Sequence, residues 1–555
     1  MIIGLDVGGT HTDVVLLEKS GPVKNVKVPT DTSDLFSTVL KGFEKITEGI
    51  DPKKIKRAVL STTLTTNAIV QSTVQTVGMI VIGGPGIDPE LFKTNDHYYS
   101  VKGYIDHRGR EAESIDETQI KEISRKLKKD GILHVGVVGK FSARNPSQEN
   151  RVYEILNNNF EKIFLGHQIS GNLNFPRRIA TTYLNAAVYP IHKDFFEAVR
   201  SSLKTKGLNV PIHILKADGG TMSFESSIDY PAQTIFSGPA ASVMGAIATA
   251  PDSDVIVLDI GGTTTDIAML IDGAPVLEPL GIALGGYKTL IRSLKTKSIG
   301  IGGDSHVRVE KGEIKIGPER LGRAMAYGGP VPTTTDAIFV LNEDNSNEFE
   351  KAKIAVESIA KELKISPIDA AQKIFDKACD VILEEVEKTV RQINSQPVYT
   401  IHELLDGYKV KPTTIMVLGG PAKEFAIHLE KMSNYSVGIV HEWKVANAIG
   451  AGLARTTCEV MLFADTQHNI IAAPEENFSE PVGSHYTKND AIMQATDLLK
   501  EKALKNGSSS EDFEVEIIED LEFNMVRGFS TVGKNIRVKV QVKPGLIHGY
   551  DPIGA

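Results

Sequence analysis

The apolar and polar residues of the chain follow two alternating patterns. Short apolar runs such as residues 78–83 are typical of buried strands, whereas residues 116–129 repeat their apolar positions at helical spacing. Strands and helices that alternate in this way predict an α/β fold. Residues 345–393 differ, because they are helical almost throughout and contain Ser366 and Pro367 as an N-cap and a first helical residue. We interpret this stretch as a helical insertion.

One apolar segment occurs twice. The sequence IIGLDVGGTHTDVV (2–15) returns as VIVLDIGGTTTDIA (255–268). In each copy a strand ends in aspartate, a Gly-Gly-Thr turn follows and a second β-prone run comes next, so each copy predicts a β-hairpin. A Rossmann or P-loop phosphate site passes from strand through glycines directly into a helix, and neither spacing is present here. The duplication predicts two related domains.

A third glycine pair, Gly419-Gly420, has a different context. It follows an apolar strand and precedes a helical run at 425–431. Further on, residues 445–454 form a helix of small residues, which lets another helix approach closely and which we expect at the domain interface.

The tail has its own pattern. Thr487 precedes a helical run as an N-cap, with Asp490 three residues on, and residues 536–542 alternate as a strand does. A Gly-Ser-rich linker separates the two elements, so the tail predicts a small α+β appendage.

Length and composition narrow the class of protein. A chain of 555 residues is too long for one hydrophobic core, and 41% hydrophobic with 24% charged residues is ordinary for a globular protein. The net charge of -9 and the scattered lysines and arginines argue against nucleic acid or a membrane surface as partner. Cys379 and Cys458 stand alone in apolar stretches and are expected as reduced, buried thiols. Without a signal peptide or a membrane-length apolar run, we expect a cytoplasmic protein.

The duplicated turns suit a phosphate chain. Glycine permits close backbone approach, and consecutive amides in a tight turn form an anion nest. Asp6 and Asp259 end apolar strands, where an ionised carboxylate is costly unless it meets a cation or donors, and Mg²⁺ held largely through its waters is the natural partner. The expected ligands are therefore ATP and Mg²⁺. Phosphate binding is assigned to Gly8, Gly9, Thr10, Thr12, Gly261, Gly262, Thr263 and Thr264, adenosine contact to Gly419 and Gly420, and the metal to Asp6 and Asp259.

Each glycine pair also has a simpler explanation. It can be a tight hairpin turn in which the neighbouring aspartate bonds the turn amides. A single copy does not distinguish the two explanations, whereas two matched copies and a third pair favour the nucleotide site.

Further motifs carry a resemblance. Over roughly residues 1–454 the chain resembles the A-type subunit of the hydantoinase/oxoprolinase family, within the superfamily of actin, sugar kinases and heat-shock ATPases. Besides the phosphate motifs, the family pattern is matched by STTLTTNA (61–68), by Arg178 with Thr181, Thr182 and Asn185, and by SGPAAS (237–242), GIGGDS (300–305), GP (317–318), YGG (327–329) and TDA (335–337).

The resemblance implies ATP-dependent activation of a carbonyl compound. Phosphoryl transfer to the carbonyl oxygen depends mainly on positioning and charge neutralisation. It implies that Asp6 and Asp259 orient Mg²⁺ and phosphate, that Gly302 and Gly303 belong to the nucleotide site, and that Asp13 and Asp266 act as bases or orient a water. The last two alternatively cap the turn beneath the site.

The chain departs from the family pattern at several positions. His11 stands where an aromatic residue is usual, and Asp304 stands at a glycine position, which puts the substrate in doubt. Arg177 replaces an acid, and GHQ (166–168) replaces a Ser-His-Glu pattern.

Pattern and resemblance together predict the architecture. We expect duplicated ribonuclease-H-like (actin-like ATPase) domains with a helical insertion and a small C-terminal α+β appendage. The expected parts are an N-terminal hydantoinase-type domain (1–185), a second actin-like domain (186–344), the helical insertion (345–400), the adenosine-motif part of the second domain (401–458) and the appendage (459–555).

Three hypotheses for the function follow. The leading one is an ATP-dependent hydrolase subunit that activates the carbonyl of a cyclic amide of hydantoin or 5-oxoproline type. The ATPase subunit of an acetone-carboxylase-like ligase and a partner-coupled ATPase of activator type stay open as alternatives. The implied partners are a small carbonyl or cyclic-amide substrate, a B-type hydantoinase subunit and further copies of this chain in a homo-oligomer.

Overall fold

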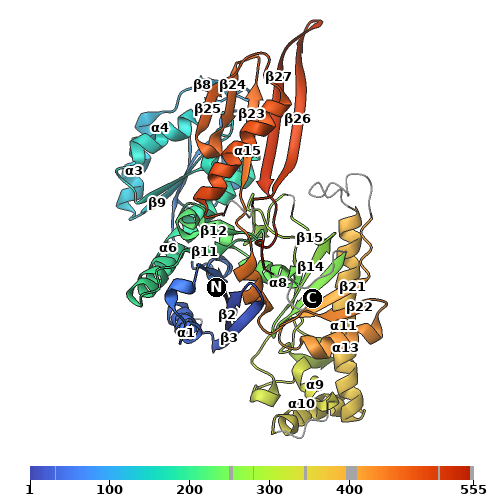
Figure 1. Cartoon of the computed structure of the whole chain (residues 1–555). Coiled ribbons are helices and arrows are strands. Elements are labelled where there is room, and N and C mark those ends of the chain that lie inside the picture. Colours follow the sequence, from blue (N-terminus) through green and yellow to red (C-terminus); the bar gives the residue numbers. More distant parts are fainter. Residues whose placement is uncertain are drawn as a thin grey trace.

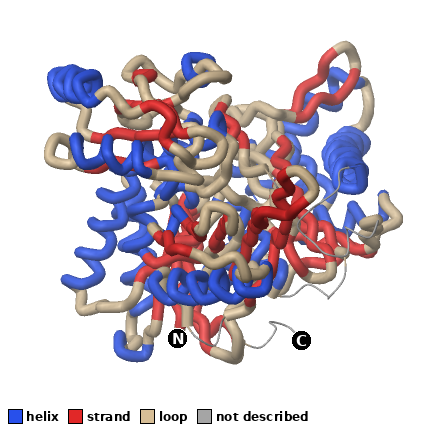
Figure 2. The backbone as a smooth tube through the Cα atoms, turned by 90° about the horizontal axis from the view of Figure 1, so that it is seen from above, coloured by secondary structure: helices blue, strands red, loops and turns tan. Residues whose placement is uncertain are grey.

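The computed structural model describes residues 1–9, 11–31, 33–248, 254–278, 280–342, 347–395, 409–509 and 513–550. Thr10, one of the expected phosphate donors, lies outside the described residues. The described strands form several sheets that are flanked by helices (Figures 1 and 2). The chain is thus a mixed α/β protein, as its apolar pattern predicts.

The first half is built on a six-stranded sheet of order β12-β11-β4-β1-β2-β3. Strand β1 runs antiparallel to β2 and parallel to β4, and β4 runs parallel to β11. Phe43 and Phe196, from two helices, are buried against this sheet. The elements are β1 (Ile2–Val7), β2 (His11–Glu18), β3 (Gly21–Pro29), β4 (Arg57–Thr62), β11 (Ile212–Leu215), β12 (Thr221–Ser223), α1 (Leu35–Thr47) and α6 (Phe175–Thr205).

The second half repeats the same central pairing. Strand β13 runs antiparallel to β14 and parallel to β21, in a sheet of order β15-β14-β13-β21-β22 with β18 on β14. The internal repeat of the sequence is therefore a repeat of structure, and both expected hairpins are confirmed. The elements are β13 (Val255–Ile260), β14 (Thr265–Ile271), β15 (Ala274–Pro275), β18 (Lys297–Ile299), β21 (Thr414–Leu418), β22 (Ser436–Ile439), α8 (Ser237–Ile247) and α13 (Ala422–Met432).

A separate four-stranded parallel sheet is inserted between β4 and β11. It includes the expected strand at 78–83 and is flanked by the expected helix at 116–129, whose N-cap is Asp116. Its elements are β5 (Gly78–Ile82), β6 (Tyr98–Val101), β9 (His134–Gly139), β10 (Lys162–Leu165), α3 (Glu117–Lys129), α4 (Ser147–Leu156) and α5 (Gly166–Ile169).

The helix of small residues, α14 (Ala446–Leu453), lies between the two halves, as expected. On one side a methyl group at Gly4 of β1 would come 2.0 Å from the carbonyl oxygen of Ala448. On the other side a methyl at Gly245 of α8 would come 2.3 Å from the carbonyl oxygen of Ala446. Backbone therefore meets backbone on both faces, which only glycine allows.

The helical stretch of the second half consists of α9 (Thr334–Leu341), α10 (Asn347–Leu363) and α11 (Pro367–Ser395). The Ser366 hydroxyl accepts from the Asp369 amide, which is the expected N-cap. The apolar face of α11 packs on the second sheet through Phe375 and Ile382, so the helices are part of the core of that half. The 345–400 boundary of the insertion stays a prediction, and residues 396–400 lie outside the described part.

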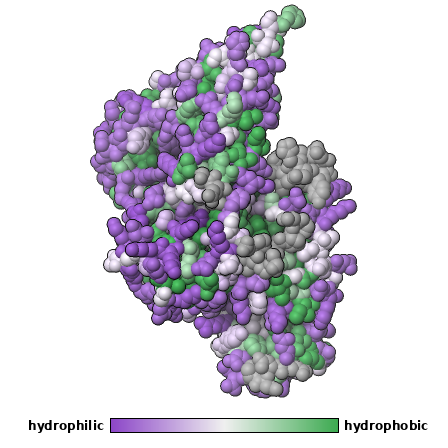
Figure 3. Space-filling model, viewed as in Figure 1, coloured by the Kyte–Doolittle hydropathy of each residue, from purple (hydrophilic) through white to green (hydrophobic). Residues whose placement is uncertain are grey.

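The C-terminal part is a five-stranded antiparallel sheet of order β25-β24-β23-β27-β26 with one helix packed on it. The capping box of Thr487 and Asp490 at the start of that helix is confirmed. Strands β26 and β27 form a long hairpin that projects from the molecule (Figures 1 and 3) and leaves Phe529 fully exposed at its turn. The elements are β23 (Glu459–Asp465), β24 (Ile470–Ala473), β25 (Phe478–Pro481), α15 (Lys488–Lys505), β26 (Val515–Arg527) and β27 (Ser530–Val542).

Short elements connect these parts. They are α2 (Leu64–Val70), α7 (Phe224–Asp229), β7 (Tyr104–Ile105), β8 (Glu111–Glu113), β16 (Ala283–Leu284), β17 (Tyr287–Lys288), β19 (Val307–Glu310) and β20 (Glu313–Ile316).

Candidate functional site

The two glycine turns have the same geometry. The Gly8 amide donates to the carbonyl of His11 at 3.1 Å, and the Gly261 amide donates to the carbonyl of Thr264 at 2.9 Å. Within the described part of the chain, the amides of the next residues, Gly9 and Gly262, have no hydrogen-bond partner. Each turn therefore presents a free amide, as an anion nest requires.

The aspartates before the two turns share one amide group. The Asn447 side chain on α14 donates to Asp259 Oδ2 at 3.3 Å and also lies close enough to the Asp6 carboxylate to lower its pKa. Ser242 of α8 donates to Asp259 Oδ2 at 2.5 Å, and Ser61 lies close enough to Asp6 to lower its pKa. The two carboxylates, from opposite halves of the molecule, thus lie near the same Asn447 side chain.

Burial governs the charge of these carboxylates. It raises the pKa of Asp6 to about 7, although bonds from Ser61 and Asn447 oppose it and the nearby carboxylates of Asp13 and Asp259 add to it. Burial also raises the pKa of Asp259 against its bonds to Ser242 and Asn447. Among the described residues, neither carboxylate has a lysine or arginine partner, so the charge of the ionised pair is balanced only by neutral donors.

Asp13 and Asp266 lie directly across the hairpins from Asp6 and Asp259. Facing residues of an antiparallel pair project from the same face, so each hairpin carries two neighbouring carboxylates. Asp13 pairs with Lys27 at 2.7 Å, whereas Asp266 lies opposite Ser298 of β18, which lowers its pKa. Burial together with the Asp259 charge raises the pKa of Asp266 to about 6. Neither acid bonds a turn amide among the described residues.

The GIGGDS segment (300–305) donates backbone hydrogen bonds to the carbonyl groups of the second turn. The Gly303 amide donates to the Gly261 carbonyl at 2.9 Å, the Asp304 amide to the Gly262 carbonyl at 2.6 Å, and the Gly302 amide to Ser305 Oγ at 2.8 Å. These amides are already engaged, so Gly302 and Gly303 contribute close packing to the turn.

Asp304, the residue that departs from the family glycine, lies beside the second turn. Its Oδ2 is 2.9 Å from the point where a methyl group on Gly262 would lie. Arg320 pairs with the same oxygen at 2.8 Å. A carboxylate that would repel phosphate is therefore neutralised by an arginine next to it.

The third glycine pair joins the same site. Gly419 has a φ of +99°, and a methyl there would come 2.7 Å from Asp259 Oδ1. No atom lies within 4 Å of the corresponding point on Gly420, which faces open space. Strand β21 is followed by the two glycines and α13, in the expected order.

The expected threonine donors differ in their availability. Thr12 is buried and its hydroxyl bonds the Thr30 hydroxyl at 2.9 Å. Thr263 and Thr264 are half-buried, and their hydroxyls have no protein partner in the described ranges. The second turn therefore offers hydroxyl donors that Thr12 does not.

Sequence reasoning missed Asn447, Ser242 and Ser61 as partners of the carboxylates. Two of them had a signal, because Ser242 ends the SGPAAS segment and Ser61 begins STTLTTNA, both of which match the family pattern. Asn447 is the polar residue in an otherwise apolar, small-residue helix.

Two kinds of feature are absent from the described residues. Within the described ranges, no group of three or more histidine, cysteine, aspartate or glutamate side chains forms a metal cage. No helix of the described part combines the length and apolarity that crossing a bilayer requires.

The relatives of the chain include subunits of enzymes. An uncharacterized protein of Methanocaldococcus jannaschii is 27% identical over 510 residues, which are 81% of this chain and 72% of that protein. The acetophenone carboxylase gamma subunit of Aromatoleum aromaticum is 25% identical over 67% of this chain. The caprolactamase subunit alpha of Pseudomonas jessenii is 24% identical over 61% of it. The match spans 58% and 54% of the lengths of the last two.

Two solved structures share the fold over the whole chain. The ATP-dependent caprolactamase of Pseudomonas jessenii aligns with a TM-score of 0.71 at 18% identity, over all of this chain and 89% of that one. The nucleotide-free acetone carboxylase aligns with a TM-score of 0.68 at 18% identity, over 99% of this chain and 88% of that one.

The family itself follows from the sequence match. The model described as Hydantoinase/oxoprolinase matches residues 178–460, and the model described as the Hydantoinase/oxoprolinase N-terminal region matches residues 2–160. The chain is a member of the hydantoinase/oxoprolinase family.

Proposed function

We propose that this chain is the ATP-binding subunit of an enzyme that activates the carbonyl of a cyclic amide by phosphoryl transfer. One observation carries the proposal: two matched glycine turns, from the two halves of the chain, each follow an aspartate that is buried or half-buried, and Asn447 bonds Asp259 and lowers the pKa of Asp6. Two anion nests on either side of one carboxylate pair suit a nucleotide with its metal.

The carboxylates fit Mg²⁺. Burial without a cationic partner holds the pKa of Asp6 near 7, and a bound cation would stabilise the ionised form. Two carboxylates are few ligands, which suits an ion that keeps several waters and binds phosphate oxygens. When bound, Mg²⁺ would neutralise charge on the transferring phosphoryl group. Asp6 and Asp259 would hold it.

The remaining residues would position the phosphates and the nucleophile. The free amides of Gly9 and Gly262 donate to phosphate oxygens, and the hydroxyls of Thr263 and Thr264 add donors at the second turn. Asp266, with a pKa of about 6, is ionised at neutral pH and can accept a proton from an attacking group.

In a lactam, transfer of a phosphoryl group to the amide oxygen makes the adjacent carbon electrophilic, which prepares the ring for opening. The protein's part in that step is to position the groups and to stabilise charge. The name of the Pseudomonas jessenii relative, an ATP-dependent caprolactamase, supports a lactam as the class of substrate.

The fold and its partners complete the proposal. The repeated pairing around β1 and β13 supports two ribonuclease-H-like domains with the expected boundaries. Three relatives are named as subunits, which supports a second, B-type subunit that works with this chain in the cytoplasm.

A ligase subunit is the second candidate. The likeness to acetone carboxylase and the relationship to the acetophenone carboxylase gamma subunit favour it, because carboxylation of a ketone also begins with activation of oxygen by ATP. Dependence of ATP turnover on a ketone plus bicarbonate would separate this candidate from the first.

The test is phosphate release from Mg-ATP by the purified chain. It is measured alone and with 5-oxoproline, hydantoin, caprolactam, or acetone plus bicarbonate. Stimulation by a cyclic amide supports the hydrolase, and stimulation by acetone plus bicarbonate supports the ligase. If no compound stimulates turnover, even after a co-purified partner subunit is added, the carbonyl-activating function is wrong and the partner-coupled ATPase takes its place.

A further inference from the structure

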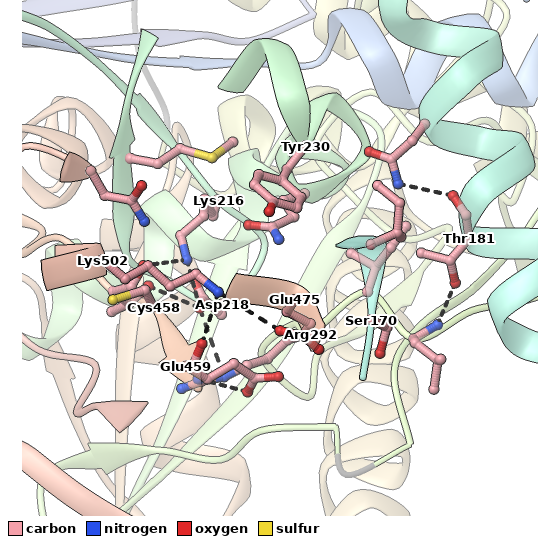
Figure 4. A pocket seen from close by; sticks show the side chains of 18 residues that line it. Ser170, Thr181, Lys216, Asp218, Tyr230, Arg292, Cys458, Glu459, Glu475 and Lys502 are labelled. Atoms are coloured by element: carbon pink, nitrogen blue, oxygen red, sulfur yellow. Dashed lines mark hydrogen bonds and ion pairs between the residues drawn. The ribbon is translucent and has the colours of Figure 1, made fainter. Parts of the chain in front are cut away.

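A cavity of about 70 Å³ lies away from the glycine turns, between helix α6, the segment after β11 and the C-terminal sheet (Figure 4). The family-pattern residues Thr181 and Asn185 line it from α6, Arg292 lines it from the second half, and Lys502 lines it from α15. In Figure 4 charged side chains gather on one side of the cavity and Thr181 lies on the other.

Most charges around the cavity are satisfied by protein partners. Asp218 accepts from Lys216 at 3.1 Å, from Thr457 at 2.9 Å and from the Gly220 amide at 3.0 Å. Lys502 donates to the Glu459 carbonyl at 3.0 Å and forms further ion pairs with the two acids that follow Pro474. These groups form a framework and leave little capacity for a ligand.

Arg292 is the exception. Its Nη1 makes one long bond, of 3.4 Å, to Glu459, and its Nε lies 3.7 Å from Asp218. Its Nε and Nη2 are buried and have no hydrogen-bond partner among the described residues. A buried guanidinium edge with unused donors is costly unless a ligand or water occupies it, and its planar fork matches a carboxylate.

The cavity and the first phosphate turn lie at the same edge of the first sheet. Strands β1, β4 and β11 are parallel, and Gly8 and Lys216 directly follow β1 and β11. Strands β1 and β11 are separated only by β4, so the two ends are about 10 Å apart. A ligand in the cavity would therefore lie near the nucleotide that the proposed function places at the turn.

We propose that this cavity binds a small planar oxyanion through the free edge of Arg292. The volume holds about five to seven water-sized positions, enough for bicarbonate or for a carboxylate group with a short stem. Thr181 lies on the opposite side of the cavity from Arg292, and Asn185 also lines the cavity. Binding of an anion in this cavity does not depend on the proposed function. Only the role of that anion as a second ligand in the reaction rests on it.

The test uses the full chain without ATP and measures binding by calorimetry. The probes are bicarbonate, acetate and 5-oxoproline, and acetamide is the neutral match of acetate. We expect acetate to bind at least about tenfold more tightly than acetamide, because only the anion makes charge-assisted bonds to Arg292. Binding of 5-oxoproline would identify the carboxylate of a substrate, and binding of bicarbonate with exclusion of 5-oxoproline would identify a free oxyanion.

Variants make the assignment specific. Arg292→Gln should weaken binding of the anion at least about tenfold, and Arg292→Lys should keep part of it, because lysine retains the charge without the fork. Arg308→Gln, at a surface ion pair, is the control that should leave binding unchanged. Equal binding by wild type and Arg292→Gln, or no binding of any anion by folded protein, overturns the proposal. Because ATP turnover is measured separately, loss of turnover with intact anion binding would count only against the proposed function.

Discussion

The two glycine turns have the same backbone and different surroundings. Around the first turn, Lys27 neutralises Asp13, and a methyl group on Gly9 would meet no described atom within 4 Å. Around the second turn, Asp266 has a serine in place of a cation, and Asp304 with its arginine partner packs behind Gly262. Duplication has thus preserved the hydrogen bonds of the turn, whereas the charges around it have diverged.

We propose that this difference divides the work of the site. The first turn is open and its acid, Asp13, is paired with a lysine, which suits binding of phosphate. The second turn has free hydroxyls and an acid with a raised pKa, which suits proton transfer. The two copies of the turn therefore share a backbone geometry, whereas the side chains around each copy determine its charge and its hydrogen-bond donors.

The largest effect should come from the carboxylates of Asp6, which is buried, and Asp259, which is half-buried. Asp6→Asn and Asp259→Asn keep the shape of the side chain and remove its charge, so each should lower kcat for ATP hydrolysis by about 10²–10³-fold. Steady-state phosphate release measures it, with circular dichroism as the check on folding. Asp497→Asn, at an exposed position of α15, is the matched control. Unchanged turnover in either variant would end the model of two carboxylates on one metal.

The next effect concerns stability against pH. Asp266 has a folded pKa of about 6, above the unfolded value of 3.8, so the folded state binds more protons and stability falls as pH rises from about 4 to about 6. Asp266→Asn should therefore stabilise the nucleotide-free protein at pH 8 by about 2–3 kcal/mol, with no gain at pH 4. Thermal unfolding at both pH values measures it.

Asp13→Asn is the comparison for that measurement. Burial also raises the pKa of Asp13, but Lys27 opposes the rise, and the substitution removes the ion pair. Its gain at pH 8 should be smaller than that of Asp266→Asn. Equal gains would mean that the two turns do not differ in charge as described.

A smaller effect should follow from loss of the shared amide. Asn447 lowers the pKa of both Asp6 and Asp259 against burial, so Asn447→Ala should raise both values. We expect kcat/KM to fall about tenfold at pH 7 and the acidic limb of the pH profile to move to higher pH. Asn447→Asp should be worse, because it adds a third negative charge. A lower rate with an unmoved pH profile would show that Asn447 only packs.

The smallest effect distinguishes Gly9 from Gly262, the two glycines whose amides are free within the described part of the chain. Gly262→Ala should cost about 1 kcal/mol of stability, because its methyl group meets Asp304 at 2.9 Å, and Gly262→Ala combined with Asp304→Gly should recover it. Gly9→Ala should leave the unfolding temperature unchanged and raise KM for ATP, because its methyl group enters the open space in front of the turn. Denaturant unfolding and KM together test both statements.

Much of the fold follows from local pattern. The hairpins, the capping of α11 and α15 and the helix at Glu117–Lys129 depend on residues close together in the chain. The sequence could predict that Asp6 and Asp259 belong to one site only because the same motif occurs twice. The role of Asn447 could not be predicted from the sequence, because Asn447 lies 188 residues from Asp259. Its helix of small residues indicates only close packing.

The cavity could not be predicted from the sequence either, because its residues are far apart in the chain. Thr181, Arg292 and Lys502 come from separate segments, and none stands in a pattern that names the others. What makes Arg292 noticeable is the pair of donors that folding leaves without partners, and an unused hydrogen bond has no signature in a sequence.

The glycine contacts of α14 have a mechanical consequence. Interlocked side chains fix the angle and the register of packed elements, because ridges lie in grooves. At Gly4, Gly245 and Gly450 backbone lies against backbone with no side chain between, so these contacts lack interlocking ridges. Small sliding of packed elements is the shear type of domain movement. We expect nucleotide-driven closure to occur as shear along this helix, with Asn447 remaining between the two aspartates.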